Sequence, residues 1–217
     1  MSTLDRVGKA EGFLAKGIIP MISFVHFRRR PHPASGFSMV ELAGTMGVIL
    51  VLAAIAVPTF INAYRVYQVS DAATQLAGIL QATRFEAIRR NTPVNCIIQQ
   101  AAGVTNIWTD SNKNSTEDPT ERQIIFNGAA NLVDAGNVPG TAALTAAVGV
   151  STLANVSLSN ASLGFDQRGA GDPNSVYALY ITNTNSPDAG YRAVIVFPSG
   201  SLQTWQADAQ GNWHFLK

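Results

Sequence analysis

An α+β fold is predicted for this chain, with a long N-terminal helix packed on a small antiparallel β-domain. The 217-residue sequence keeps one helical pattern from Phe37 to Arg90, apolar on all sides at first and amphipathic afterwards. Beyond Pro93 the pattern changes to period two, in short runs separated by turn residues. A chain of this length holds one modest domain plus an extended element.

Charge is scarce and unevenly distributed. Charged residues make up 13% of the chain, about half of what soluble domains usually carry. Residues 1–36 hold six Lys or Arg and two Asp or Glu, so the remainder carries three more acidic than basic side chains. Nucleic-acid binding needs clustered positive charge, and a broad DNA-binding surface is therefore not expected.

Residues 1–36 have the composition of a targeting leader rather than of a folded element. Met21 is an alternative start that would shorten this leader and keep Arg28–Arg30. Because Lys and Arg next to a membrane span remain cytoplasmic, the C-terminal domain is expected on the opposite, extracytoplasmic side.

The segment from Phe37 to Ile61 is apolar enough for a single membrane span, since a helix of about 25 residues exceeds the ~30 Å hydrocarbon core. Glu41 lies inside it, where a carboxylate costs roughly 2.5–3.5 kcal/mol on insertion scales. A plain anchor needs no such group, and Glu41 is therefore a candidate functional residue. Pro58 lacks a backbone donor, so a kink or local loosening is predicted there.

The amphipathic half of the helix, residues 62–91, repeats apolar positions every three or four residues. Asn91 and Pro93 are predicted to end it. Its charged end is interpreted as a solvated face, with contact to the domain or to another subunit as the alternative; this end comprises Arg84, Glu86, Arg89 and Arg90. The predicted core-facing stripe comprises Val69, Ala72, Ala73, Leu76, Ile79, Leu80, Thr83, Ala87 and Ile88.

Residues 92–217 are predicted to form the β-rich domain. The section Gly128–Gly164 is ambiguous: it fits one or two strands, at Ala142–Val150 and Val156–Leu163, or a long loop. The strands predicted elsewhere are Val94–Ile98, Val104–Thr109, Gln123–Phe126, Val176–Thr182, Tyr191–Phe197, Ser201–Gln206 and Trp213–Leu216.

Four stretches carry a resemblance to type IV pilin-like proteins. Gly36-Phe37-Ser38-Met39-Val40-Glu41-Leu42 resembles the prepilin signal G-F-T-L-I-E-L, and Pro58 falls where type IV pilins also have proline. The helix end, Gln81–Asn91, resembles the A-R-S-E-A-I-x-R-N stretch of GspH/FimT-type minor pilins. Gly164–Gly169 resembles the F-D-x-R-G segment of that family, and Val194–Gly200 its late strand ending in S-G.

This resemblance implies a minor pilin or pseudopilin that joins other pilins in a type IV pilus or a type II secretion pseudopilus, at the tip or priming complex. Its further implied partners are the membrane, the inner-membrane assembly platform and a prepilin peptidase and N-methyltransferase. That enzyme would cut between Gly36 and Phe37 and methylate the new amine on Phe37. Glu41 would then compensate this amine or that of a neighbouring subunit.

Two alternative functions are weaker. FimT-like proteins implicated in DNA uptake carry G-R-x-R after the late strand, whereas this chain has Gly200-Ser201-Leu202-Gln203. A membrane-anchored binding protein or enzyme would need a convergent polar pocket in residues 94–217. With His26 and His32 in the leader, His214 alone remains for acid–base chemistry, and no enzyme is expected.

One acidic segment has the spacing of a calcium loop. Ser115 stands where such a loop has glycine, and no helices are predicted beside it. A polar hairpin loop is therefore the favoured interpretation, no cofactor is expected, and calcium is the alternative. Places 1, 3, 5, 7, 9 and 12 are occupied by Asp110, Asn112, Asn114, Thr116, Asp118 and Glu121.

The remaining candidates have structural interpretations. Cys96 is the single cysteine, which excludes an intramolecular disulfide, and it is interpreted as a small buried hydrophobe. Asp166 and Arg168 are interpreted as a local pair beside a turn. The residues His214, Trp205, Trp213 and Phe215 are assigned to the core or to an interface.

Overall fold

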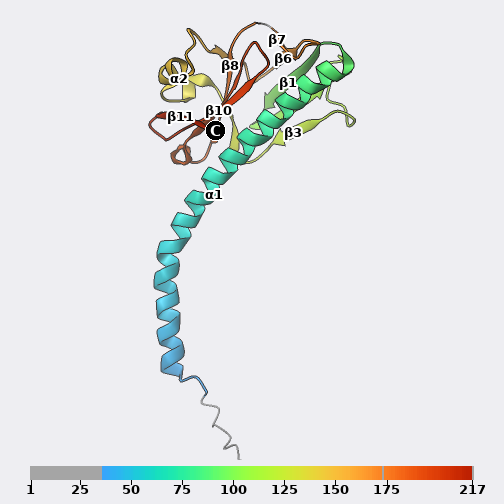
Figure 1. Ribbon diagram of the computed structural model, residues 1–217. Coiled ribbons are helices and arrows are strands. Elements are labelled where there is room, and N and C mark those ends of the chain that lie inside the picture. The colour runs from blue at the N-terminus through green and yellow to red at the C-terminus, as the bar shows by residue number, and fades with distance from the viewer. Residues whose placement is uncertain (1–35, 173, 217) are drawn as a thin grey trace, which may run out of the picture. The chain divides into compact units, whose positions relative to one another are not determined.

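The computed structural model describes residues 36–172 and 174–216. The predicted leader up to residue 35, with Met21, lies outside them. The chain divides into two compact units, Met1–Thr45 and Met46–Lys217, each considered by itself. The described elements are α1 (Met39–Arg90), β1 (Val94–Ala101), β2 (Val104–Asp110), β3 (Gln123–Phe126), β4 (Ala130–Val133), η1 (Ala135–Asn137), α2 (Thr141–Val148), β5 (Ala154–Asn155), β6 (Ala161–Phe165), β7 (Gly171–Asp172), β8 (Tyr177–Asn183), η2 (Pro187–Ala189), β9 (Tyr191–Val196), β10 (Leu202–Ala207) and β11 (Trp213–Leu216) (Figure 1).

Helix α1 is one uninterrupted element of 52 residues, about 78 Å long at 1.5 Å per residue. Asn91 and Pro93 follow its end, as predicted. The helix continues through Pro58, so the predicted loosening does not break it. Proline removes one backbone donor in this turn, and the adjacent Thr59 hydroxyl donates to the Ile55 carbonyl at 3.2 Å.

The predicted core stripe of α1 is confirmed with one exception. All its predicted members from Val69 to Ala87 are buried, whereas Ile88 is 42% exposed. Leu76 and Leu80 are fully buried and lie at the centre of the larger apolar cluster. The prediction holds because a spacing of three and four residues places these side chains on one face of the helix.

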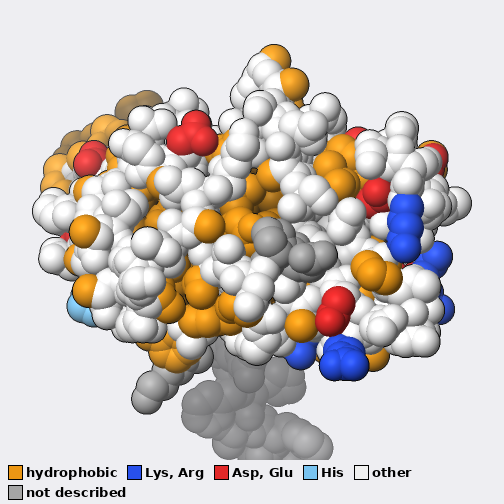
Figure 2. Space-filling view, turned by 90° about the horizontal axis from the view of Figure 1, so that it is seen from above, with side chains coloured by type: hydrophobic (Ala, Val, Ile, Leu, Met, Phe, Trp, Pro, Cys, Tyr) orange, Lys and Arg blue, Asp and Glu red, His pale blue; other side chains and the backbone are white. Residues whose placement is uncertain are grey.

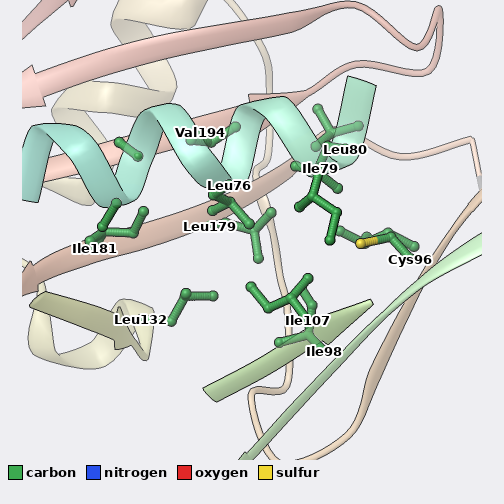
Figure 3. Packing of buried hydrophobic residues seen from close by; sticks show 14 of the residues in the cluster. Leu76, Ile79, Leu80, Cys96, Ile98, Ile107, Leu132, Leu179, Ile181 and Val194 are labelled. Atoms are coloured by element: carbon green, nitrogen blue, oxygen red, sulfur yellow. The ribbon is translucent and has the colours of Figure 1, made fainter. Parts of the chain in front are cut away.

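The strands form two sheets. Sheet A has the order β3-β2-β1-β6-β7, with antiparallel pairing throughout. Sheet B has the order β11-β10-β9-β8-β4, and the short β5 pairs with β8 in parallel. Their apolar faces meet α1: Figure 3 shows Leu76, Ile79 and Leu80 of the helix gathered with Cys96 and Ile98 of sheet A and with residues of β8 and β9 in sheet B.

Buried polar side chains join these layers. The Thr83 hydroxyl of α1 lies 2.8 Å from the Thr109 hydroxyl of β2. Thr105 of β2 donates to the Asn131 side chain of β4 at 2.6 Å, which ties sheet A to sheet B. Each of these four side chains thus gains a partner that offsets its lost hydration.

The ambiguous section Gly128–Gly164 contains a helix that neither of its predicted forms included. The segment expected as a strand, Ala142–Val150, is mostly helix α2. Its alanine-rich sequence favours a helix, and Gly140 and Gly149 flank it in the left-handed conformation. Leu144 is fully buried against the second apolar cluster, which covers the other face of sheet B with Trp205 and Trp213.

The other predicted strands occur with shifts of a few residues at their ends. The second strand predicted for the ambiguous section, Val156–Leu163, is only partly correct, because β6 covers Ala161–Phe165 and residues 156–160 are not in a strand. Strands β4, β5 and β7 were not predicted, because they are only two to four residues long, too short to show an alternation of apolar and polar residues.

We predict that Leu76→Ala lowers the free energy of unfolding by about 2–5 kcal/mol, because it empties a fully buried site at the centre of the larger cluster. Guanidinium unfolding of the detergent-solubilised full chain, followed by tryptophan fluorescence, measures this change. The control is Gln81→Ala on the exposed face of the same helix, which should change stability by less than about 0.5 kcal/mol. Equal effects of the two variants would contradict the assigned core.

Candidate functional site

The prepilin-like signal lies at the start of α1. Gly36 and Phe37 precede the helix, and Phe37 is 79% exposed. The Ser38 hydroxyl accepts a hydrogen bond from the Val40 amide at 3.3 Å, which caps the first turn. Glu41 lies in that turn and is exposed, where the helix dipole favours a carboxylate. The bond between Gly36 and Phe37 is thus accessible, and a charged side chain lies one turn beyond it.

The first half of α1 presents apolar side chains that nothing in the described chain covers. Met39, Leu50 and Phe60 are 88%, 70% and 72% exposed. A Cβ added at Gly44 or Gly47 would meet no atom within 4 Å, so both positions are open. Among the described helices, α1 alone is long and apolar enough to cross a membrane, by length and composition. An exposed apolar surface of this extent requires lipid or other helices as its environment.

The three family-like motifs of the domain meet at one place. Arg84, in the helix-end motif, donates from Nε to the Gly169 carbonyl at 2.9 Å. Gly169 belongs to the second motif and Gly200 to the third, and both have a positive φ, of 78° and 75°. A Cβ on Gly200 would clash with the Gly169 carbonyl and lie 2.9 Å from Arg84 Nε. Gly169 and Gly200 therefore allow the two turns and Arg84 to come close together, and Arg84 holds the Gly169 turn by a hydrogen bond. These are structural roles.

The Asp166–Arg168 pair predicted beside this turn is not formed. Asp166 Oδ1 instead accepts hydrogen bonds from the backbone amides of Arg168 and Ala170, both at 2.8 Å. The Asp166 side chain thus caps its own turn through Oδ1. The structural interpretation of Asp166 holds with a different partner.

The charged end of α1 both pairs internally and contacts the domain. Glu86 forms ion pairs with Arg89 and Arg90, and Arg90 also donates to the Ser111 carbonyl at 3.2 Å. The hydrogen bond from Arg89 is the strongest influence that lowers the pKa of Glu86 to about 2. With Arg84, these contacts favour the alternative to a purely solvated face.

Because the pKa of Glu86 is lowered, its ion pairs stabilise the helix end only within a certain pH range. The pKa of Glu86 in the folded chain lies below its ordinary value of 4.5. Its contribution is therefore fully present above about pH 4.5 and is lost as the pH falls toward 2. Partly exposed pairs of this kind contribute only about 0.3–0.5 kcal/mol each.

The acidic loop between β2 and β3 is a hairpin loop without flanking helices, as favoured from the sequence. Asp110 is 1% exposed, and its carboxylate accepts from the Asn114 and Ser115 amides at 3.1 Å. Glu121 is 7% exposed and accepts from the Ser111 amide at 2.8 Å. Asp118 accepts from the side-chain amides of Asn112 and Asn114. Within the described residues no three His, Cys, Asp or Glu side chains form a metal cluster by themselves.

Cys96 and the C-terminal aromatics lie mostly where the sequence placed them. Cys96 is fully buried, and burial raises the pKa of its thiol to about 12. Trp205 and Trp213 belong to the second apolar cluster, while Phe215 is 46% exposed and lies 5.4 Å from Trp205 between ring centroids. His214 is exposed. These residues give no convergent catalytic set.

Sequence reasoning missed Arg192, a buried arginine in β9. Its guanidinium donates to the Ser70 hydroxyl of α1 and to the Tyr191 carbonyl, both at 3.0 Å, while Nε has no partner. Burial lowers the pKa of this side chain. It was identifiable only as the single charge in the otherwise apolar run Tyr191–Val196.

Three features together define a pilin-like protein. They are the prepilin-like signal, an apolar helix half that no other part of the described chain covers, and a β-domain packed on the other half of the helix. The chain belongs to the GspH family, since the family model described as Type II transport protein GspH matches residues 72–200. The resemblance drawn from the motifs is thereby confirmed, as is the α+β pilin-like fold.

Comparison with solved structures gives two crystal forms of the type IV minor pilin FimU from Pseudomonas aeruginosa, strain PAO1. The first, in space group P21, is 12% identical with a TM-score of 0.45, and covers 70% of this chain and 94% of that one. The second, in space group P65, is 14% identical with a TM-score of 0.42, and covers 68% and 97%. Comparison with curated proteins finds no match.

We predict that Gly200→Ala destabilises the domain by at least about 2 kcal/mol, because alanine is strained at this positive φ and its Cβ would meet the Gly169 carbonyl. The matched control is Gly78→Ala on the exposed face of α1, where an added Cβ meets nothing within 4 Å. That substitution should stabilise the helix by roughly 0.5–1 kcal/mol. Denaturant unfolding of both variants measures the two signs, and a neutral Gly200→Ala would contradict the close approach of the three motifs.

Proposed function

We propose that this protein is a minor pilin or pseudopilin subunit, cut between Gly36 and Phe37 by a prepilin peptidase and N-methylated on Phe37. It is then incorporated at the tip or priming complex of a type IV pilus or type II secretion pseudopilus. The observation that carries this proposal is the prepilin-like signal at the start of α1, a helix that is exposed and apolar at first and enters the domain core from Val69 onward.

The domain division follows from the same proposal. Residues 1–36 are the leader, 37–61 the span and assembly segment, 62–91 the amphipathic helix half and 92–217 the GspH/FimT-like β-rich domain. The basic leader keeps the N-terminal side cytoplasmic and leaves the β-domain periplasmic. Before assembly the subunit is held in the inner membrane, where the assembly platform receives it.

Glu41 supplies the assembly contact. Cleavage creates a free amine on Phe37, close to Glu41 in the first turn of the helix. Either charge alone is costly at membrane depth, and pairing them removes most of that cost. A subunit docked at the wrong height leaves both charges unpaired, so the contact between one Glu41 and a neighbouring amine sets the register of assembly.

The apolar helix half supplies the packing surface. Its partners are the corresponding helices of other pilins, because association inside a membrane relies on close packing rather than on expulsion of water. Gly44 and Gly47 are open to such an approach. Pro58, at the place where type IV pilins have proline, leaves one carbonyl of this helix half without its usual amide donor.

DNA uptake is not favoured. The turn after β9 reads Gly200-Ser201-Leu202-Gln203, and neither arginine of the FimT-like pattern is present. On the face shown in Figure 2, uncharged side chains predominate and Lys and Arg gather toward one edge. This distribution offers no broad basic surface on that face for a phosphate backbone.

We predict that Glu41→Val is still cleaved but is at least about tenfold depleted from the sheared filament or pseudopilus fraction. Without Glu41 the amine on Phe37 has no partner, and an unpaired charge at membrane depth costs more than about 1.4 kcal/mol, which corresponds to a factor of ten in an equilibrium. Immunoblotting reports cleavage by the change in mobility, and the sheared fraction reports incorporation. Thr45→Val, one turn later on the same helix, removes a polar group without a charge and should incorporate normally. Normal incorporation of Glu41→Val would overturn the pairing.

A further inference from the structure

The geometry points to a calcium site in the loop between β2 and β3, formed by oxygen atoms of Asp110, Asn112, Asn114, Asp118 and Glu121. This loop takes no part in the proposed processing or in the proposed packing of α1 against helices of other subunits, so the inference is independent of them. Carboxylate and amide oxygens are the ligands that calcium prefers, and their spacing over twelve residues matches that of a calcium loop.

The main objection from the sequence was Ser115, which stands where a calcium loop has glycine for a sharp turn. The structure gives Ser115 a φ of 56°, in the left-handed region. The backbone therefore makes the required turn despite the side chain. The amides of Asn114 and Ser115 point at the Asp110 carboxylate within this turn, both at 3.1 Å.

The independent observation is an unpartnered buried carboxylate oxygen. Glu121 is 7% exposed, and its Oε2 is buried with no hydrogen-bond partner. Its Oε1 holds the carboxyl group against the start of the loop, at 2.8 Å from the Ser111 amide and 3.4 Å from the Asn112 amide. A buried carboxylate oxygen without a partner is costly, and a bound cation removes that cost.

No side-chain cation fills this role. The ion pairs of the described residues all involve Glu86. Arg90 reaches the loop at the Ser111 carbonyl but is engaged by Glu86, and the exposed Arg122 forms no ion pair with Glu121. From Asp110 to Glu121 the loop has four acidic side chains and one lysine, so its net charge favours a cation.

The two asparagines complete the ligand set. Three acidic side chains alone do not converge as a cluster, but the side-chain amides of Asn112 and Asn114 both meet Asp118, at 2.6 and 2.8 Å. Their carbonyl oxygens each accept one backbone hydrogen bond, from Asn114 and Thr116, and keep a second lone pair for an ion. A set of carboxylates and amide carbonyls without nitrogen or sulfur favours calcium over transition metals.

Isothermal calorimetry of the full chain in detergent, stripped of metal and titrated with calcium chloride, tests the site. We expect one calcium per chain with a dissociation constant of about 10⁻⁴–10⁻³ M, the range of extracellular calcium modules. Glu121→Gln should abolish binding, and Asn114→Ala, at an exposed position that should not disturb folding, should weaken it at least about tenfold. Ser115→Gly should tighten binding several-fold, because glycine adopts this φ without strain.

The matched control is Glu117→Gln, which removes the same charge from the same loop at a place that is not a ligand position. It should change the affinity less than about threefold. Equal weakening by Glu117→Gln and Glu121→Gln would show diffuse attraction of cations and overturn the site. Absence of saturable heat up to about 10 mM calcium, ten times the weakest constant of that range, or equal binding of magnesium, would also overturn it.

Discussion

Burial of a single stripe of α1 between two sheets is the interaction on which the rest of the structure depends. Leu76, Ile79 and Leu80 contribute to the larger apolar cluster together with strands of both sheets. Each such side chain stabilises the fold by about 1.5–3 kcal/mol when fully buried. Sheets A and B are separate ladders, and the helix supplies the apolar surface that both of them cover. The larger of the two apolar clusters therefore cannot form without the second half of α1.

This dependence explains why the family-like motifs lie where they do. The helix end is attached to the sheet turns through Arg84 and the Gly169 carbonyl, and Gly200 permits the close approach. These are positioning contacts, and no acid–base or nucleophilic set accompanies them in the described residues. The features for which we propose partners or a bound ion lie elsewhere on the chain: at the start of α1, along its uncovered apolar half and in the loop after β2.

The sequence predicted those parts of the fold that have a strong period. The buried stripe from Val69 to Ala87 was predictable because a helix repeats every 3.6 residues, and the longer strands because their apolar runs end at turn residues. Helix α2 was not predicted, because Thr141–Val148 is short and rich in small residues and fitted a strand or a long loop. Arg192, the capping role of Asp166 and the conformation of Ser115 depend on tertiary contacts or local backbone geometry, which no local pattern encodes.

In our proposal one helix, α1, begins at a cleavage site, passes through an apolar segment and ends in the core of the domain. Intact-mass and peptide mass spectrometry of the protein extracted from membranes tests its first and most consequential part. We expect a mature chain that begins at N-methylated Phe37. A chain that retains residues 1–36, or one cut after the apolar segment near Ile61, would contradict it.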